Sequence, residues 1–245
     1  MTVAATDWLV ACFQPTTFFT LKPAGSTSSG GKSLLAPTPF ALKMALLDVA
    51  LRFYGQDSGQ TLFPAIRDLK IALKVPRQAV VNNTFIKIMR PHKGGVKDIT
   101  GTGLETPLGH TIAFREYVSY RGEMCFAFQG MAADALSPLL PQINYLGKRG
   151  GFIQLQHEPV GQSWSAEELK QNHYIMLTAA TQPFSLNGLL QMLDDCGPKM
   201  TFDHANIYSR KRIRLGQERI LHHVVLPYQL VRSSRGYSYY ERLDE

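Results

Sequence analysis

The sequence predicts an α+β fold, and three observations lead to this prediction. Strand-like runs rich in aromatic and β-branched residues are interspersed with fewer helix-like segments. Two of the strands flank a long polar stretch that carries five glycines, which predicts a long β-hairpin. The order of elements is β-α-β-(hairpin)-β-α-β, a ferredoxin-like order of the RNA-recognition type. In chain order we expect a strand at 8–21, a helix at 40–54, strands at 69–75, 80–90, 111–120 and 123–129, a helix at 132–146 and a strand at 152–157.

The helix at 40–54 is the strongest in the chain. Thr38 is a good N-cap residue, and Pro39 suits the first helical position because its missing N–H would have no partner there. Gly55 supplies the residue that commonly follows a helix end. Because the segment is rich in Ala, Leu and Met and carries only three charged residues, we expect it to be mostly buried against a sheet.

Two cations lie in a glycine-rich turn before the strand at 152–157. Lys148 and Arg149 follow Gly147 and precede Gly150 and Gly151. Glycine permits sharp turns and the close approach of another backbone. Two adjacent cations on such a turn suit a phosphodiester better than a small neutral substrate, although a basic surface turn is the plainer interpretation.

The last third of the sequence is less regular. Residues 158–172 resemble a linker, and a run of tyrosines lies at 237–240. Between them we expect a strand at 174–177, a helix at 185–193 and a strand at 220–228. We therefore expect a ferredoxin-like domain at 1–157 and a smaller β-rich C-terminal lobe at 158–245.

The charge of the chain favours a polyanionic partner. Lys and Arg number 26 against 19 Asp and Glu, which gives a formal net charge of +7 and a pI near 9.3. Nucleic acid is the commonest such partner, and an anionic membrane is the next to consider. The sequence has no apolar span of about 18 residues and no secretory signal at its start, so we expect a cytoplasmic protein without membrane association.

No motif indicates a cofactor, a metal site or a hydrolytic site. The glycine-rich segment before the helix has the wrong spacing for the phosphate-binding loop of nucleotide hydrolases, and prolines delay the helix. The three cysteines lie far apart without a C-x-x-C pair, so we expect buried free thiols at Cys12, Cys125 and Cys196. The histidines are expected to be structural or solvated, although His92 and His110 could meet at the base of the hairpin.

Basic residues recur along the strands and the hairpin. They are accompanied by two asparagines and by aromatic residues, and a second basic cluster lies at 210–219 with Glu218 as its one acidic residue. Cations on a sheet, beside aromatic residues that can stack on splayed bases, suit the recognition of single-stranded RNA. The alternative is a solvated sheet face with core aromatics. Taken as a set, the pattern favours nucleic acid.

This combination resembles the RAMP (repeat-associated mysterious protein) superfamily of CRISPR effector subunits, and within it the Cas-five family of Cascade-type complexes. The resemblance rests on the aromatic first strand, the segment 34–40 that opens the first helix, the long hairpin at about 80–120 and the turn at 145–152. It covers residues 8–157 and little of the last third of the chain.

The resemblance implies an RNA-binding subunit of a type I CRISPR surveillance complex. Such subunits grip the 5′ handle of the CRISPR RNA, cap the filament of backbone RAMP subunits and dock the large subunit that reads the protospacer-adjacent motif, so that target DNA is engaged indirectly. Their hairpin, the thumb, is pushed between nucleotides of the guide and corresponds here to about 80–120. Carried onto this chain, the implied RNA-binding residues are Lys22, Lys32, Ser33, Arg77, Asn82, Asn83, Lys87, Arg90, Lys93, Arg115, Lys148 and Arg149.

Three other functions stay open at this point. One branch of the family cleaves precursor CRISPR RNA without metal, using a Tyr, Lys and His set, and this chain contains Tyr54, His92 and Lys93. The sequence does not place these three together, so we expect a non-catalytic subunit. A backbone-type filament subunit would assemble repeatedly along the RNA instead of once per guide. A small-molecule enzyme would need a deep apolar pocket with convergent polar groups.

Overall fold

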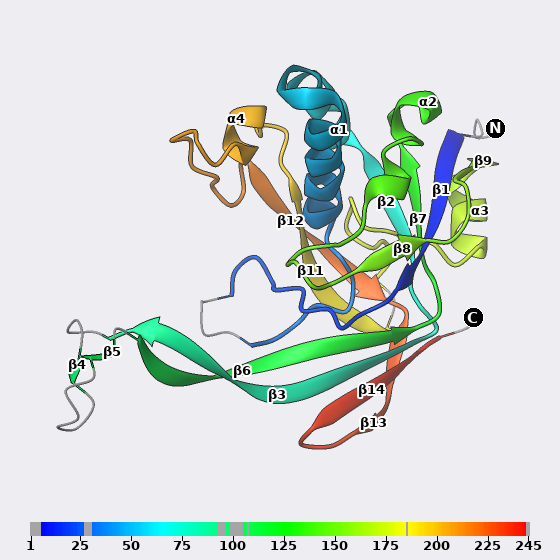
Figure 1. Cartoon of the computed structure of the whole chain (residues 1–245). Coiled ribbons are helices and arrows are strands. Elements are labelled where there is room, and N and C mark those ends of the chain that lie inside the picture. Colours follow the sequence, from blue (N-terminus) through cyan, green and yellow to red (C-terminus); the bar gives the residue numbers. More distant parts are fainter. Residues whose placement is uncertain are drawn as a thin grey trace.

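The computed structural model describes residues 6–26, 31–92, 97–98, 105–106, 108–184 and 186–243. It combines helices with antiparallel sheets (Figure 1), as the sequence predicts. The helical elements are α1 (Pro39–Asp68), α2 (Ala133–Leu136), the 3-10 turn η1 (Leu140–Gln142), α3 (Ala166–Gln171) and α4 (Phe202–Ala205). The strands are β1 (Thr6–Pro15), β2 (Lys70–Lys74), β3 (Gln78–Pro91), β4 (Lys97–Asp98), β5 (Glu105–Thr106), β6 (Leu108–Arg121), β7 (Met124–Gln129), β8 (Ile153–Leu155), β9 (Val160–Trp164), β10 (Ile175–Met176), β11 (Leu189–Cys196), β12 (Arg219–Leu226), β13 (Tyr228–Ser233) and β14 (Tyr237–Arg242).

The central sheet contains five of the predicted strands, β1, β2, β7, β8 and β10. Its order is β10-β2-β7-β1-β8, every pair is antiparallel, and β9 also pairs with β1. Successive side chains of β1 point to opposite faces of the sheet, as in any pleated strand. Leu9, Ala11 and Phe13 join the main core with residues of α1, whereas Trp8 packs with Leu169 of α3 in a separate cluster.

The first helix begins where the sequence predicts. The Thr38 hydroxyl accepts a hydrogen bond from the Ala41 N–H at 3.1 Å, and Pro39 follows at the start of the helix. Gly55 interrupts the helical geometry with a φ of +81°. The chain then resumes its helical course to Asp68. The sequence does not predict that the helix continues, because Gly55 and Pro64 are both unfavourable inside a helix.

The long β-hairpin is present. β3 and β6 pair without interruption from Gln78 and Arg121 at the base to Pro91 and Leu108 toward the tip. With β13 and β14 they form a second sheet of order β13-β14-β3-β6, and the outer half of the hairpin projects from the body of the protein (Figure 1). The expected strands are thus confirmed and are longer than predicted. Much of the polar stretch at 91–109 lies outside the described residues.

Two predicted elements are shorter than expected because of proline. The strand predicted at 8–21 ends at Pro15, which lacks an N–H for the ladder. The helix predicted at 132–146 is reduced to α2 and η1, since Pro138 and Pro141 cannot continue an α-helix.

Two other predictions for the last third are wrong. Residues 158–172 do not form a linker, because they contain β9 on the central sheet and α3, which Ser165 begins with a capping box. The segment predicted as a helix at 185–193 is a strand from Leu189 onward, because it pairs with β12 along its whole length.

The remaining strands of the last third join elements from the first part of the chain. The expected strands near 174–177 and 220–228 are confirmed as β10 and β12, and the run of tyrosines forms β14. β10 pairs with β2, β14 pairs with β3, and β11 packs against α1. Strands from both sides of residue 157 therefore share sheets, and the division into two folding units stays a prediction.

Cys12 and Cys125 form a disulfide, contrary to the expectation of free thiols. They are direct partners in the antiparallel pair of β1 and β7, and their Cα atoms lie 3.9 Å apart. Their separation of 113 residues in the sequence conceals this proximity. Cys196 is free and buried as expected, and its burial raises the pKa of the thiol to about 12.

We expect the variant Cys12→Ala/Cys125→Ala to be less stable than the wild type by about 2–4 kcal/mol, because the disulfide restricts the unfolded chain across a long loop. Chemical unfolding with and without dithiothreitol measures the difference. The reductant should destabilise the wild type and leave the variant unchanged. Cys196→Ala keeps the bonded pair and should keep the response to reductant. Equal responses from the wild type and the double variant would contradict the disulfide.

Candidate nucleic-acid interface

An open cleft of about 540 Å³ lies beside the N-terminal half of α1. Segments near residues 20–22 and 31–32, the strand β6 and the glycine-rich turn also line it, together with Asp194 and Arg219. Four of the predicted RNA-binding residues meet in this cleft, namely Lys22, Lys32, Arg115 and Lys148. Three aromatic side chains share the lining, namely Phe40, Tyr117 and Tyr145.

Glu116 of β6 fixes the segment 31–33 at the edge of the cleft. Its carboxylate is buried, accepts a hydrogen bond from the Ser33 N–H at 2.8 Å and pairs with the Lys32 ammonium at 2.8 Å. The Glu116 N–H donates to the Gly31 carbonyl at 2.7 Å. Gly31 lies so close to the Phe114 carbonyl that a Cβ would not fit. The segment is therefore held by contacts that its own sequence does not reveal.

The glycine-rich turn has the geometry that its sequence predicts. Gly147 and Gly150 have φ values of +70° and +112°, a region that favours glycine. The Thr17 hydroxyl donates to the Gly150 carbonyl at 2.6 Å and accepts from the Phe152 N–H at 2.7 Å. These contacts tie the turn to the chain that follows β1, so the cations on it are carried by a fixed backbone.

The charges of the cleft are only partly neutralised by the protein. Lys22 and Lys148 are exposed, and neither forms an ion pair within the described residues. Lys32, in contrast, pairs with Glu116. Arg149 is exposed beside Lys148 on the same turn but does not line the cleft. The two unpaired ammonium groups make the cleft attractive to an anion.

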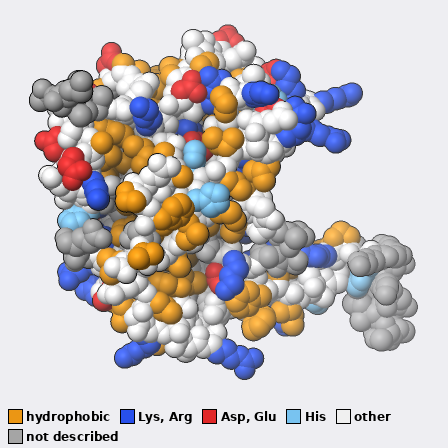
Figure 2. All heavy atoms as spheres, turned by 180° about the vertical axis from the view of Figure 1, so that it is seen from behind, with side chains coloured by type: hydrophobic (Ala, Val, Ile, Leu, Met, Phe, Trp, Pro, Cys, Tyr) orange, Lys and Arg blue, Asp and Glu red, His pale blue; other side chains and the backbone are white. Residues whose placement is uncertain are grey.

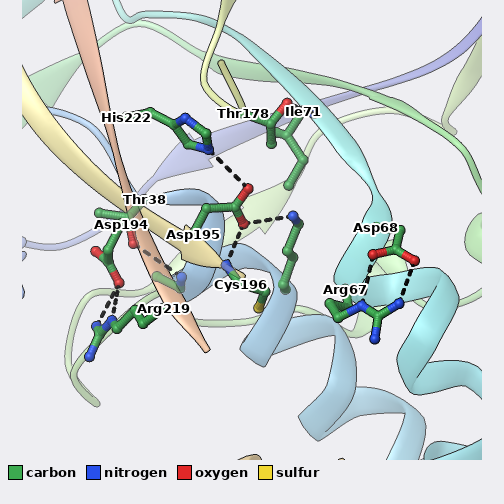
Figure 3. A network of polar contacts seen from close by, with 12 residues as sticks. Thr38, Arg67, Asp68, Ile71, Thr178, Asp194, Asp195, Cys196, Arg219 and His222 are labelled. Carbon is green, nitrogen blue, oxygen red and sulfur yellow. Dashed lines mark hydrogen bonds and ion pairs between the residues drawn. The ribbon is translucent and has the colours of Figure 1, made fainter. Parts of the chain in front are cut away.

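Arg219 forms another wall of the cleft. Its guanidinium lies 4.1 Å from the centre of the Phe40 ring and donates to the Asp194 carboxylate at 2.7 Å (Figure 3). Asp194 is only 2% exposed, so its charge is directed to Arg219 and not to solvent. Because the Asp194 carboxylate neutralises the Arg219 guanidinium, Arg219 adds little free positive charge to the cleft. It acts mainly as part of the wall and as a contact for the Phe40 ring.

A buried polar network lies close to this wall. One Asp195 carboxylate oxygen accepts from the Lys43 ammonium at 2.6 Å and from the Cys196 N–H at 2.7 Å. The other carboxylate oxygen lies 3.5 Å from Nε2 of His222 (Figure 3). Lys43 belongs to α1, and the other residues belong to β11 and β12. The network thus joins the ribbon of β11 and β12 to the helix that lines the cleft.

The other predicted site residues do not reach the cleft. Arg77 is exposed in the connection between β2 and β3, and Lys87 and Arg90 are exposed farther along β3. Lys87 and Arg90 are an odd number of positions apart, so their side chains leave opposite faces of the hairpin. Lys93 lies outside the described residues.

Three predicted polar residues have partners within the protein or lie in the sheet. The Ser33 hydroxyl accepts from the Leu21 N–H at 2.9 Å and therefore closes its own loop. The Asn83 amide donates to the Arg235 carbonyl at 3.1 Å, which fastens the turn between β13 and β14 to β3. Asn82 is partly buried opposite Tyr237 of β14.

The outer hairpin exposes an apolar face, and two of its residues, Phe85 and Phe114, are among the aromatic residues that accompany the basic pattern in the sequence. Phe85 and Ile112 are each 70% exposed, and Met89 is 57% exposed. Phe85 contacts Phe114 edge to face, with ring centres 5.6 Å apart. All four residues share the face of β3 and β6 on which Lys87 lies. An apolar face with a cation can enter a stack of bases.

Tyr54 and His92, the two described residues considered for RNA cleavage, lie in different elements. Tyr54 is exposed in α1 next to the break, whereas His92 follows β3 in the outer hairpin. His92 packs against Gly109, and His110 faces Met89, so the two histidines lie toward the tip and not at the base of the hairpin as expected.

Potential metal ligands come together at one place in the described part of the chain, at Cys12, Glu123 and Cys125. Because the two sulfurs are bonded to each other, neither is available as a thiolate ligand.

No helix within the described ranges is long and apolar enough to cross a membrane.

Comparison with known proteins identifies one curated relative. The chain is 24% identical over 211 residues to a protein of Archaeoglobus fulgidus named CRISPR-associated protein Cas5, and the alignment spans 84% of this chain and 86% of that protein. No family model matches the chain.

Two solved structures are similar at low sequence identity. One is the crystal structure of a CRISPR protein from Archaeoglobus fulgidus, with a TM-score of 0.48 and 11% identity over 98% of this chain and 93% of that one. The other belongs to a CRISPR RNA-guided surveillance complex, with a TM-score of 0.44 and 13% identity over 77% of this chain and 81% of that one. The resemblance to the Cas-five family that the sequence motifs indicate is confirmed by the curated relative.

Proposed function

We propose that this protein is an RNA-binding subunit of a Cascade-type CRISPR effector complex and that its cleft holds the 5′ handle of the CRISPR RNA. One observation carries the proposal: the cleft gathers four of the predicted RNA-binding cations, and Arg219 as a fifth, beside three aromatic rings. Cations neutralise phosphates and aromatic rings stack on unpaired bases, so the two together suit single-stranded RNA. The relative named as a CRISPR-associated protein supports the same assignment.

The fold is consistent with this function. We assign a ferredoxin-like arrangement to β1, α1, β2, β7 and β8, because the antiparallel order β2-β7-β1-β8 places the first strand of such a domain between the third and the fourth. The hairpin of β3 and β6 takes the role of the thumb, since its exposed apolar face can separate neighbouring bases of the guide. The last third, with β11 to β14, is proposed as the smaller lobe.

The partners follow from the same proposal. They are the CRISPR RNA, the backbone RAMP subunits and the large subunit that reads the protospacer-adjacent motif, with target DNA engaged through the complex. We propose a non-catalytic role, and the endoribonuclease alternative is one outcome of the test below.

The test is to purify the protein together with the proteins encoded beside it and to sequence the RNA that co-purifies. We expect one guide-sized RNA with a uniform 5′ end derived from the repeat, and one copy of this protein for each RNA. Several copies for each RNA would instead indicate a filament subunit. Cutting of a precursor repeat by the isolated protein in the presence of a chelator would indicate an endoribonuclease. A monomer without RNA would contradict the proposal.

A further inference from the structure

The segment 206–218, between α4 and β12, stands out from the body of the protein. In Figure 1 it projects on the same side as the outer hairpin, and in Figure 2 Lys and Arg side chains extend from the surface on that side. It holds most of the second basic cluster, which the proposed function does not use. The segment leads directly into Arg219, which lines the cleft.

Hydrogen bonds within the segment give it a defined shape. The Ser209 N–H donates to the Asn206 carbonyl at 3.0 Å, and the Lys211 N–H donates to the Ser209 hydroxyl at 3.1 Å. Farther along, the Arg214 carbonyl accepts the N–H groups of Glu218 and Arg219, each at 3.2 Å. A segment fixed in this way presents its side chains at little further cost in conformational entropy.

Two carboxylates help to hold this shape, that of Asp203 in α4 and that of Glu218 at the end of the segment. Lys211 pairs with Asp203 at 2.8 Å, and its ammonium lowers the pKa of that carboxyl. The Arg214 N–H donates to the Glu218 carboxylate at 2.9 Å and lowers the pKa of Glu218. Both carboxylates are therefore engaged by residues of the segment.

Two arginines are left without such partners. Arg210 and Arg212 are exposed, and neither has an ion pair within the described part of the chain. Beside them, Ile207 is 86% exposed and Tyr208 is 90% exposed. The guanidinium group matches a phosphate with two parallel hydrogen bonds, and an exposed tyrosine ring offers a surface for a base.

We propose that the segment 206–218 is a second phosphodiester-binding site, in which Arg210 and Arg212 bind phosphates and Tyr208 stacks on a base. Because the segment leads into Arg219, which lines the cleft, the strand it receives is continuous with the one in the cleft or runs beside it. This continuity rests on the proposed function, whereas the site itself does not. Its phosphodiester belongs to the CRISPR RNA or to DNA, and binding assays separate these two sources.

The test compares Arg210→Ala/Arg212→Ala with the wild type by fluorescence anisotropy, on a single-stranded RNA and on a duplex DNA of about 30 nucleotides per strand. If RNA is the ligand, its affinity should fall about a hundredfold, and the slope of log affinity against log salt should be less steep by about 1.4. If DNA is the ligand, RNA binding stays unchanged and duplex binding falls about a hundredfold. Either result supports the site. Unchanged affinity for both would overturn it.

Two further variants sharpen the comparison. Arg232→Ala/Arg235→Ala removes two exposed arginines near the turn between β13 and β14, and it should leave both affinities unchanged if the effect is local. Tyr208→Ala should weaken RNA more than duplex DNA, because stacking needs an unpaired base. Lys22→Ala/Lys148→Ala reports on the cleft in the same assay. Sensitivity to the segment without sensitivity to the cleft would contradict the proposed function and leave the second site standing.

Discussion

Replacing Lys22 and Lys148 together with alanine should weaken the binding of single-stranded RNA about a hundredfold, because each lost hydrogen bond from a charged group to a phosphate costs about tenfold. These two side chains line one cleft and have no ion pair within the described residues, so the protein itself supplies no counter-charge for them. The measurement is a binding titration at several salt concentrations. The salt dependence should become less steep by about 1.4, since two counterion-releasing contacts are gone.

Arg149→Ala is the matched control for this experiment. Arg149 is exposed on the same turn as Lys148 and carries the same charge, but it lies outside the lining of the cleft. We expect its removal to change the affinity much less than Lys148→Ala does. Equal losses from the two single variants would mean that the RNA runs over the turn, and the cleft would then not be the binding site.

Lys43→Met should lower the free energy of unfolding by about 3–5 kcal/mol, because it leaves the Asp195 carboxylate buried without its cation. Lys43 is 2% exposed and its ammonium lies 2.6 Å from Asp195, so solvent cannot take its place. Chemical denaturation measures the loss. The double variant Lys43→Met/Asp195→Leu should recover most of it, since no charge then remains buried at that place.

An exposed ion pair of the same helix provides the comparison. Arg52 donates to Asp48 one turn away at 3.0 Å, and both side chains are nearly half exposed. Arg52→Ala should therefore cost only about 0.5 kcal/mol. If Lys43→Met cost no more than Arg52→Ala, the buried network would not be a determinant of stability.

The parts of the fold that depend on local chemistry could be predicted from the sequence. Thr38 and Pro39 mark the start of α1 because capping involves residues only a few positions apart. The alternation of apolar and polar residues locates β2, β3 and β6 because the period of a strand is a local property. β9 and β11 were missed because pairing with distant strands decides their conformation. The disulfide depends in the same way on the register of β1 against β7.

The sequence predicts the basic residues of the candidate site but not the acidic residues that pair with them. Lys22, Lys32 and Lys148 follow from loops and a turn that are recognisable in the sequence. Glu116 and Asp194 were not singled out, because a carboxylate acquires its role only from a partner that folding brings to it. The predicted set also joined Lys87 with Arg90, which the pleat of β3 sends to opposite faces.

The β3–β6 hairpin leaves apolar side chains of this protein exposed to water. Val81 and Val118 are buried at its base, while Phe85 and Ile112 on the same face stand in water. The inner and outer parts of the hairpin belong to one continuous ladder. The outer part therefore cannot fold back over the body unless the inner part leaves the core. An open apolar surface of this kind favours contact with other molecules. We therefore expect the burial to be completed when a partner covers this face, and a copy without that partner to keep an exposed apolar surface that favours aggregation.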